Sequence, residues 1–214
     1  MKSSAFSLVL TADQVNSREQ PDRVPAALSA LEGLDTLLPF DRTAGDEIQA
    51  LFASPFAATQ AIAGLTRLGG WRVGLGIGAI DNPLPNSTRA ARGPAYLAAR
   101  EALQVARRQP TGLALRFRRS VVDDRYGEDD DRVRDAETAL WLWRGLLSKR
   151  SQEGWELMDL LDAGQSKSAA ARSLGVSASA VSQRLAVAGR QEGDRGAILC
   201  SNLLARLLTD AEVG

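Results

Sequence analysis

Hydrophobic and polar positions divide the first part of the chain into alternating strand and helix signals. A compact apolar run at residues 5–12 predicts a buried strand that ends at Asp13. Apolar residues then recur at helical spacing, which predicts a helix from Pro21 or Asp22 to about Leu34. The later signals predict a hairpin at 43–46, a helix at 55–68, a strand at 71–80, a helix at 94–107 and a strand at 111–122. This order favours one α+β sheet with helices on one face.

Large and small residues alternate in Trp71–Ile80, WRVGLGIGAI. Glycine inside a strand marks a place where another backbone approaches closely, so we expect tight packing on a central strand here. The glycines lie within the strand rather than at a strand-to-helix turn, and the chain has no GxxxxGK motif. These two observations exclude a P-loop and a Rossmann phosphate site.

From Asp131 onward the pattern is wholly helical. It predicts helices at about 132–150, 152–162, 167–174, 178–188 and 196–208. The charged segment DDRYGEDDD separates the two patterns, and we place the domain boundary there. The sequence therefore predicts an α+β domain at 1–127 and a helical domain at 128–214.

Ser166–Leu185, SKSAAARSLGVSASAVSQRL, has the features of a helix-turn-helix. Two short helices that cross steeply need a small residue at their contact, a glycine in the turn and apolar anchors on both sides. Ala171 and Gly175 take the first two places, and the anchors are Leu174, Val176, Val181 and Leu185. The segment resembles the helix-turn-helix of bacterial transcription regulators and predicts this motif at about 166–189.

The second helix of this motif has the chemistry to meet DNA. Ser177 can cap it, and Ser179, Ser182 and Gln183 then lie opposite the anchors, where they can reach base edges. Residues 164–190 hold four basic residues and no acid, which predicts a phosphate-binding surface for double-stranded DNA: Lys167, Arg172, Arg184 and Arg190. The alternative is a helical hairpin that serves only dimerisation or interdomain packing.

The amino-acid composition excludes several kinds of metal and catalytic site. The 214 residues include 26 basic and 26 acidic residues, one Cys and no His. A disulfide framework, a Cys/His zinc site and a His-based triad are therefore excluded. No apolar stretch approaches the ~20 residues of a membrane span, and the first residues lack a signal-peptide core, which predicts a soluble cytoplasmic protein. The last helix is apolar enough to form a homodimer surface through Ile198, Leu199, Leu203, Leu204 and Leu207.

Two acidic positions suggest a metal site. Asp13 follows the first strand and Asp46 lies at the hairpin tip. The first strand lies beside the hairpin in a sheet of this order, so both carboxylates can meet at one edge and hold Mg²⁺ on a nucleotide. The alternative is ordinary loop chemistry, in which Asp46 bonds its own turn and Asp13 caps the next one, with Asn16 and Arg18 fixing the loop.

The segments LTADQVNSR, TAGDEIQALF, WRVGLGIGAI and GPAYLAAREAL, in this order, resemble the SatD family of bacterial proteins. More distantly they resemble the catalytic core of class III nucleotide cyclases and GGDEF domains. The resemblance covers residues 5 to about 117, and the SatD likeness extends into the helix-turn-helix. It implies a ferredoxin-like, nucleotide-cyclase-like sheet, with Asp13 and Asp46 at the metal-binding positions and Arg100 at the position of a phosphate-contacting arginine.

Two departures from the cyclase pattern bear on catalysis. Cyclases carry an Asn four residues before that arginine, where this chain has Tyr96, and their purine-recognising Lys and Asp have no counterpart here. The sequence thus favours a DNA-binding transcription regulator of the SatD type with a non-catalytic sensing domain. Its ligand would be a nucleotide, bound by Asp13, Asn16, Arg18, Asp46 and Arg100, that sets the dimer geometry. The alternatives are a metal-dependent cyclase or phosphotransferase with a DNA-binding tail, and a scaffold that only dimerises the helix-turn-helix.

Overall fold

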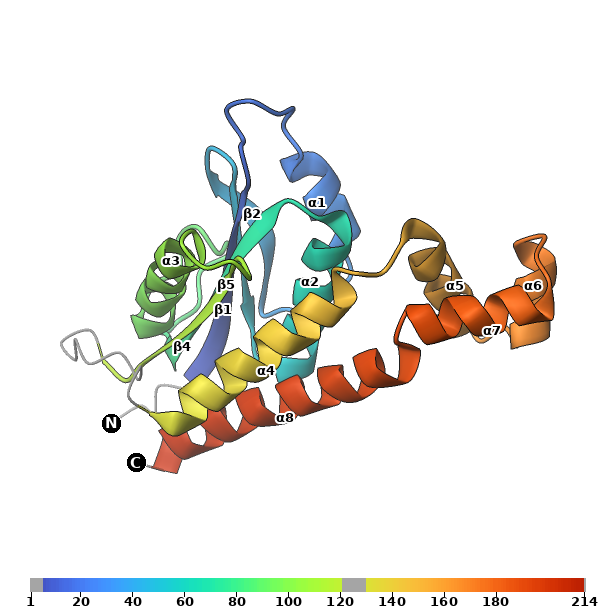
Figure 1. The fold of residues 1–214 in the computed structure, drawn as a ribbon. Helices are drawn as coiled ribbons and strands as arrows, with labels where there is room; N and C mark the ends of the chain where they lie inside the picture. Colours follow the sequence, from blue (N-terminus) through green and yellow to red (C-terminus); the bar gives the residue numbers. More distant parts are fainter. Residues whose placement is uncertain (1–5, 121–129, 214) are drawn as a thin grey trace.

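The computed structural model describes residues 6–120 and 130–213 (Figure 1). Residue 5 of the first predicted strand, residues 121–122 of the last one and most of the predicted domain boundary lie outside these ranges. The first part of the chain has the predicted order of strands and helices. Its elements are β1 Phe6–Gln14, α1 Val24–Ala30, β2 Leu38–Ala44, β3 Glu47–Phe52, α2 Pro55–Leu68, β4 Trp71–Ala79, α3 Pro94–Ala106 and β5 Leu113–Arg118. Helix α1 and strand β5 are shorter than predicted.

The sheet has the strand order β2-β3-β1-β4-β5. The pairs β2/β3, β3/β1 and β1/β4 are antiparallel, and β4/β5 is parallel. The segment from β1 to β4, with α1 and α2 as its crossovers, is therefore a ferredoxin-like β-α-β-β-α-β unit. This topology confirms the predicted α+β, ferredoxin-like fold class.

Helices cover both faces of the sheet, so the expectation of helices on one face is wrong. The large side chains of β4, such as Leu75, share a core with Ile62 of α2. The glycines of β4 point to the other face, where α3 lies (Figure 1). Strands β3, β4 and β5 are mutually parallel. The connection from β3 to β4 and the connection from β4 to β5 both move in the same direction across the sheet. The β3-α2-β4 and β4-α3-β5 crossovers thus have opposite hands, so one of them departs from the usual right-handed connection and its helix lies on the second face.

Direct backbone contact explains the alternation in β4. A Cβ at Gly74, Gly76 or Gly78 would lie 2.2–2.7 Å from backbone atoms of α3. The opposing residues of the helix include Ala95 and Ala99, which are fully buried. The expected close packing is confirmed, and it seats α3 directly on the sheet.

The second half of the chain contributes to two cores. Its helices are α4 Asp131–Leu147, α5 Gln152–Asp162, α6 Lys167–Ser173, α7 Ala178–Val187 and α8 Arg190–Val213. Buried residues of α4 and α8, such as Leu140 and Leu204, belong to the same cluster as the sheet and α2. Helices α5, α6 and α7 have a cluster of their own around Leu157 and Val181. The predicted boundary between 127 and 128 therefore does not separate the cores, because α4 and α8 complete the first one.

Polar groups of α4 fasten it to the sheet. The Trp141 indole donates to the Leu113 carbonyl at 2.8 Å, and the Trp143 indole donates to Gly193 of α8 at 2.9 Å. The buried Arg144 guanidinium donates to the carbonyls of Trp71, Thr111 and Gly112. Burial lowers the pKa of Arg144 to about 10. The two tryptophans thus anchor α4 to the sheet and to α8.

Helix α8 begins at Arg190, earlier than predicted, and runs back along α4 (Figure 1). Leu204 and Leu207 are buried in the chain's own core, and Leu203 packs against it. Only Ile198 and Leu199 of the expected dimer surface are exposed, so most of that apolar face is already used within the chain. Among the described residues, no helix is both long and apolar enough to cross a membrane.

Candidate functional site

The predicted helix-turn-helix is present in α6 and α7. Ala171 is buried, and Gly175 has a φ of +63°, the left-handed conformation that glycine adopts without strain. The anchors Leu174, Val176 and Leu185 pack on the cluster around the buried Val181. The Ser177 hydroxyl caps α7 by accepting from the Ala180 amide at 3.1 Å. The unit is therefore held by its own core, and it projects beyond the sheet in Figure 1.

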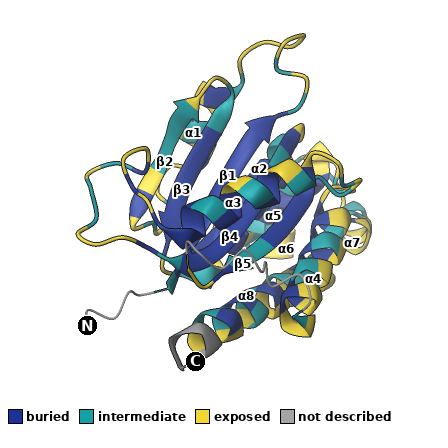
Figure 2. Cartoon of the chain, turned by 90° about the vertical axis from the view of Figure 1, so that its left-hand side faces the viewer, coloured by how far each residue is buried: buried dark blue, intermediate teal, exposed yellow. Residues whose placement is uncertain are grey.

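The outward face of α7 is uncovered. Ser179, Ser182 and Gln183 are exposed, and the anchors on the opposite side are buried or half-buried, as predicted. Lys167 and Arg172 of α6 are also exposed. Figure 2 shows α7 largely in the colours of partial and full exposure, in contrast to the buried strands. These polar side chains can approach a partner without any rearrangement of the chain.

The basic surface carries less uncompensated charge than the sequence suggested. Arg190 forms ion pairs with Asp162 at 2.6 Å and with Asp194 at 2.9 Å. Both acids lie outside the acid-free window 164–190, so a count along the sequence misses them. Arg184 is half-buried, and its charge acts on Glu153. Lys167 and Arg172 are the remaining exposed cations of the predicted four.

Asp13 lies in the sheet, next to the guanidinium groups of Arg107 and Arg72. It is 3% exposed, and its Oδ2 accepts from Arg107 Nε at 2.7 Å. Arg72 Nη1 is 3.9 Å from Oδ1, which is too long for a hydrogen bond, and Oδ1 has no other partner in the described chain. Burial raises the pKa of Asp13, and Arg107 and Arg72 lower it; the charge of Asp46 raises it slightly further. Asp13 is thus a buried carboxylate balanced by arginines.

This arrangement does not fit a divalent cation as it stands. Arg107 occupies one oxygen of Asp13, which leaves a cation only the buried Oδ1, next to the positive charges of Arg107 and Arg72. The described residues contain no group of three carboxylate, thiol or imidazole side chains that could hold a metal. A cation between Asp13 and Asp46 would have to bind beside these two guanidinium groups and recruit water or phosphate for its remaining ligands.

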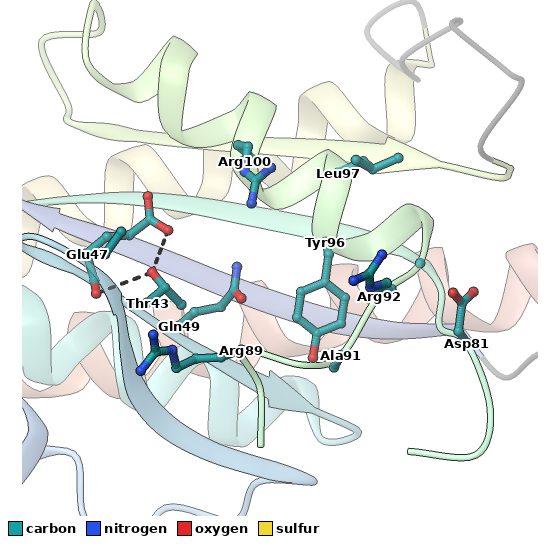
Figure 3. A pocket seen from close by; sticks show the side chains of 12 residues that line it. Thr43, Glu47, Gln49, Asp81, Arg89, Ala91, Arg92, Tyr96, Leu97 and Arg100 are labelled. Atoms are coloured by element: carbon teal, nitrogen blue, oxygen red, sulfur yellow. Dashed lines mark hydrogen bonds between the residues drawn. The ribbon is translucent and has the colours of Figure 1, made fainter. Parts of the chain in front are cut away.

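A groove lies on the α3 face of the sheet, between α3 and the β2–β3 hairpin (Figure 3). Its cavity is about 620 Å³, and its lining comes from β2, β3, the loop after β4 and the first two turns of α3. Three arginines line it, Arg89, Arg92 and Arg100, together with the acids Glu47 and Asp81. The floor includes Gln49, which is buried and donates to Thr11 at 2.7 Å.

The five residues predicted to bind a ligand do not share one cavity. Only Arg100 lines the groove. Asp13 is buried beneath Arg107, and Asp46 lies at the hairpin turn. Asn16 and Arg18 are exposed in the loop after β1, where Asn16 has a φ of +54° and its carbonyl accepts from the Glu19 and Gln20 amides. Asn16 thus shapes the loop, which is the alternative that we weighed for it.

Sequence reasoning missed most of the groove. Arg89 and Arg92 belong to the Pro/Asn/Ser-rich loop after β4, which has no periodic pattern that fixes where a side chain points. Tyr96 is only 8% exposed, and its hydroxyl lies 3.4 Å from that of Thr88. That contact ties the loop to α3. The one available signal was the density of arginines in STRAARG, immediately before the helix.

No protein-family model matches the chain, and no curated protein matches it. Among solved structures, one similar chain is described as "Structure of a bacterial light-regulated adenylyl cylcase". It is 16% identical, with a TM-score of 0.35, and the match covers 53% of this chain and 42% of that one. A similarity at this level carries no argument about activity, and the strand order alone establishes the fold class.

Proposed function

We propose that this protein is a DNA-binding regulator in which α5, α6 and α7 contact double-stranded DNA and the sheet domain senses a small anionic ligand. The observation that carries the proposal is the outward face of α7. It presents hydroxyl and amide side chains from a helix that is capped, anchored and uncovered. A second helix packed on such a unit is the geometry with which proteins enter the major groove.

Each side chain of this surface has a distinct task in the proposal. Ser179, Ser182 and Gln183 meet base edges, because hydroxyl and amide groups can donate and accept there. Lys167 and Arg172 meet phosphates and supply most of the affinity. Arg190 belongs to the scaffold of the unit, because its ion pair with Asp162 joins the start of α8 to α5 and its pair with Asp194 lies within α8.

Selection from a random duplex library tests the base-reading role. The full chain should enrich a defined sequence, and Gln183→Ala should relax the preference at one position of that sequence. Loss of one amide contact to a base costs about 1–3 kcal/mol of discrimination. Gln60→Ala is the matched control, because Gln60 is an exposed glutamine on α2. Failure to enrich any sequence, or an unchanged preference in Gln183→Ala, would remove α7 from base recognition.

The rival proposal of a metal-dependent cyclase or phosphotransferase has less support. Its cation would compete with Arg107 for Asp13, and the position where cyclases carry an amide holds the nearly buried Tyr96. Incubation with ATP or GTP and Mg²⁺ or Mn²⁺ should yield no cyclic product. Formation of such a product at an enzymatic rate would favour the rival.

A further inference from the structure

The arginines of the groove are the feature that the fold alone does not explain. The side chains of Arg89, Arg92 and Arg100 form no ion pair and no hydrogen bond with any residue that the structure describes. All three are exposed, and they come from two different segments that face one cavity. Three unpaired guanidinium groups around one groove raise its affinity for anions, because each can donate two parallel hydrogen bonds to a phosphate.

The acids of the groove do not pair with its arginines in the part of the chain that the structure describes. Glu47 is engaged by Thr43, whose hydroxyl donates to Oε1 at 2.7 Å. Asp81 lies on the opposite side of Tyr96 from Glu47 in Figure 3. Neither acid forms an ion pair with a groove arginine in the described chain. The lining therefore has three cationic and two anionic side chains, a formal excess of one positive charge, and none of the three cations is paired within the described chain.

The nearby aspartate does not call for a metal. Asp13 takes its positive partner from Arg107 and, at longer range, from Arg72. Its charge is balanced inside the chain, so a ligand in the groove needs no cation to shield it from this carboxylate. Phosphate oxygens can be held by arginines directly, with the neutral groups of Thr43 and Gln49 available to orient the rest of the molecule.

We propose that the groove binds a phosphorylated ligand of nucleotide size directly through Arg89, Arg92 and Arg100, without a divalent cation. The cavity of about 620 Å³ lies within the range of small-molecule sites. This inference rests on the sensing half of the proposed function and is independent of the DNA-binding half. It replaces the metal-bridged mode expected from Asp13 and Asp46 with recognition by guanidinium groups.

Calorimetry of the full chain in EDTA tests the proposal, with ATP, GTP, inorganic tripolyphosphate and adenosine as separate probes. We expect heat from at least one phosphorylated probe and none from adenosine. Tripolyphosphate binding as tight as nucleotide binding supports the groove and assigns recognition to phosphate alone. Tighter nucleotide binding supports it and assigns a role to the base. No heat from any phosphorylated probe, or heat only when Mg²⁺ replaces EDTA, would overturn the proposal.

Variants locate the site. Arg89→Ala, Arg92→Ala and Arg100→Ala should each weaken binding by tenfold or more, because each removes a charged donor from the phosphate. Arg108→Ala is the matched control, since Arg108 is exposed just beyond the end of α3 and outside the groove lining. Equal affinity in all four variants would place the ligand elsewhere. DNA binding is measured on the same variants. Ligand binding and DNA binding can fail independently of each other, so the failure of one proposal is distinguished from the failure of the other.

Discussion

The pairing of Asp13 with Arg107 gives a sharp prediction about stability. Arg107→Gln would remove the one hydrogen bond that the described residues give to a carboxylate that is 3% exposed. Breaking a buried pair by removing one partner costs about 3–5 kcal/mol. The Arg107 side chain is 40% exposed and Arg72 remains at 3.9 Å, so solvent screening reduces the expected loss to about 2 kcal/mol.

The pH dependence identifies the cause of this loss. Burial raises the pKa of Asp13, so the folded chain takes up a proton on this group more readily than the unfolded chain does. Asp13 therefore opposes folding above its raised pKa, and this cost disappears as pH falls through that pKa. Loss of Arg107 raises the pKa further. The deficit of Arg107→Gln should then be full at neutral pH and shrink on acidification, in a window above the ordinary Asp value of about 4.

Urea unfolding at a series of pH values measures this deficit. Asp13→Asn removes the charge and should cost less than Arg107→Gln at pH 7, because no ionised group stays buried. The double variant should be no less stable than Arg107→Gln alone, because the unpaired charge is gone. A deficit in Arg107→Gln that is absent, or that stays constant as the pH is lowered, would refute the argument.

Three further predictions concern packing, the turn and the thiol. Gly76→Ala should destabilise the chain by about 3 kcal/mol or more in urea unfolding, because its Cβ would lie 2.2 Å from the Ala99 nitrogen. Gly145→Ala, with no atom within 4 Å, should instead stabilise α4 by up to about 1 kcal/mol. Gly175→Ala should cost about 1 kcal/mol through its φ of +63°, with the loss of amide-exchange protection confined to α5, α6 and α7. Cys200, whose pKa burial raises to about 12, should resist a thiol reagent at pH 8 until the chain is unfolded; rapid labelling of the native chain would contradict its burial.

Local patterns predicted the elements well, and the reasons are physical. The Ser54, Ser151, Ser166 and Ser177 hydroxyls all cap helices, and the Gly69–Gly70 pair with positive φ ends α2. The alternation of large residues and glycines in β4 likewise predicted close contact with another backbone. It did not predict which face of the sheet α3 covers, because the handedness of a crossover depends on the order and direction of all the strands.

The sites were harder to predict than the fold. The motif 166–189 is local, so its anchors and its exposed face follow from spacing within one short segment. The groove joins a hairpin to a loop and a helix, and Arg89 and Arg92 carry no pattern that brings them together. Asp13 was predicted to bind a metal, and the structure pairs it with Arg107. Its partner Arg107 lies 94 residues away, and no spacing rule links the two.

The salt dependence of duplex binding tests the central claim most directly. Fluorescence anisotropy of the full chain with a labelled duplex should show affinity that falls steeply with salt. The double variant Lys167→Ala/Arg172→Ala should bind more weakly and show a log–log slope smaller in magnitude by about 2, one for each lost phosphate contact. Arg206→Ala, at an exposed position near the far end of α8, should match the wild type. No binding at low salt, or equal slopes for the wild type and the double variant, would contradict the account.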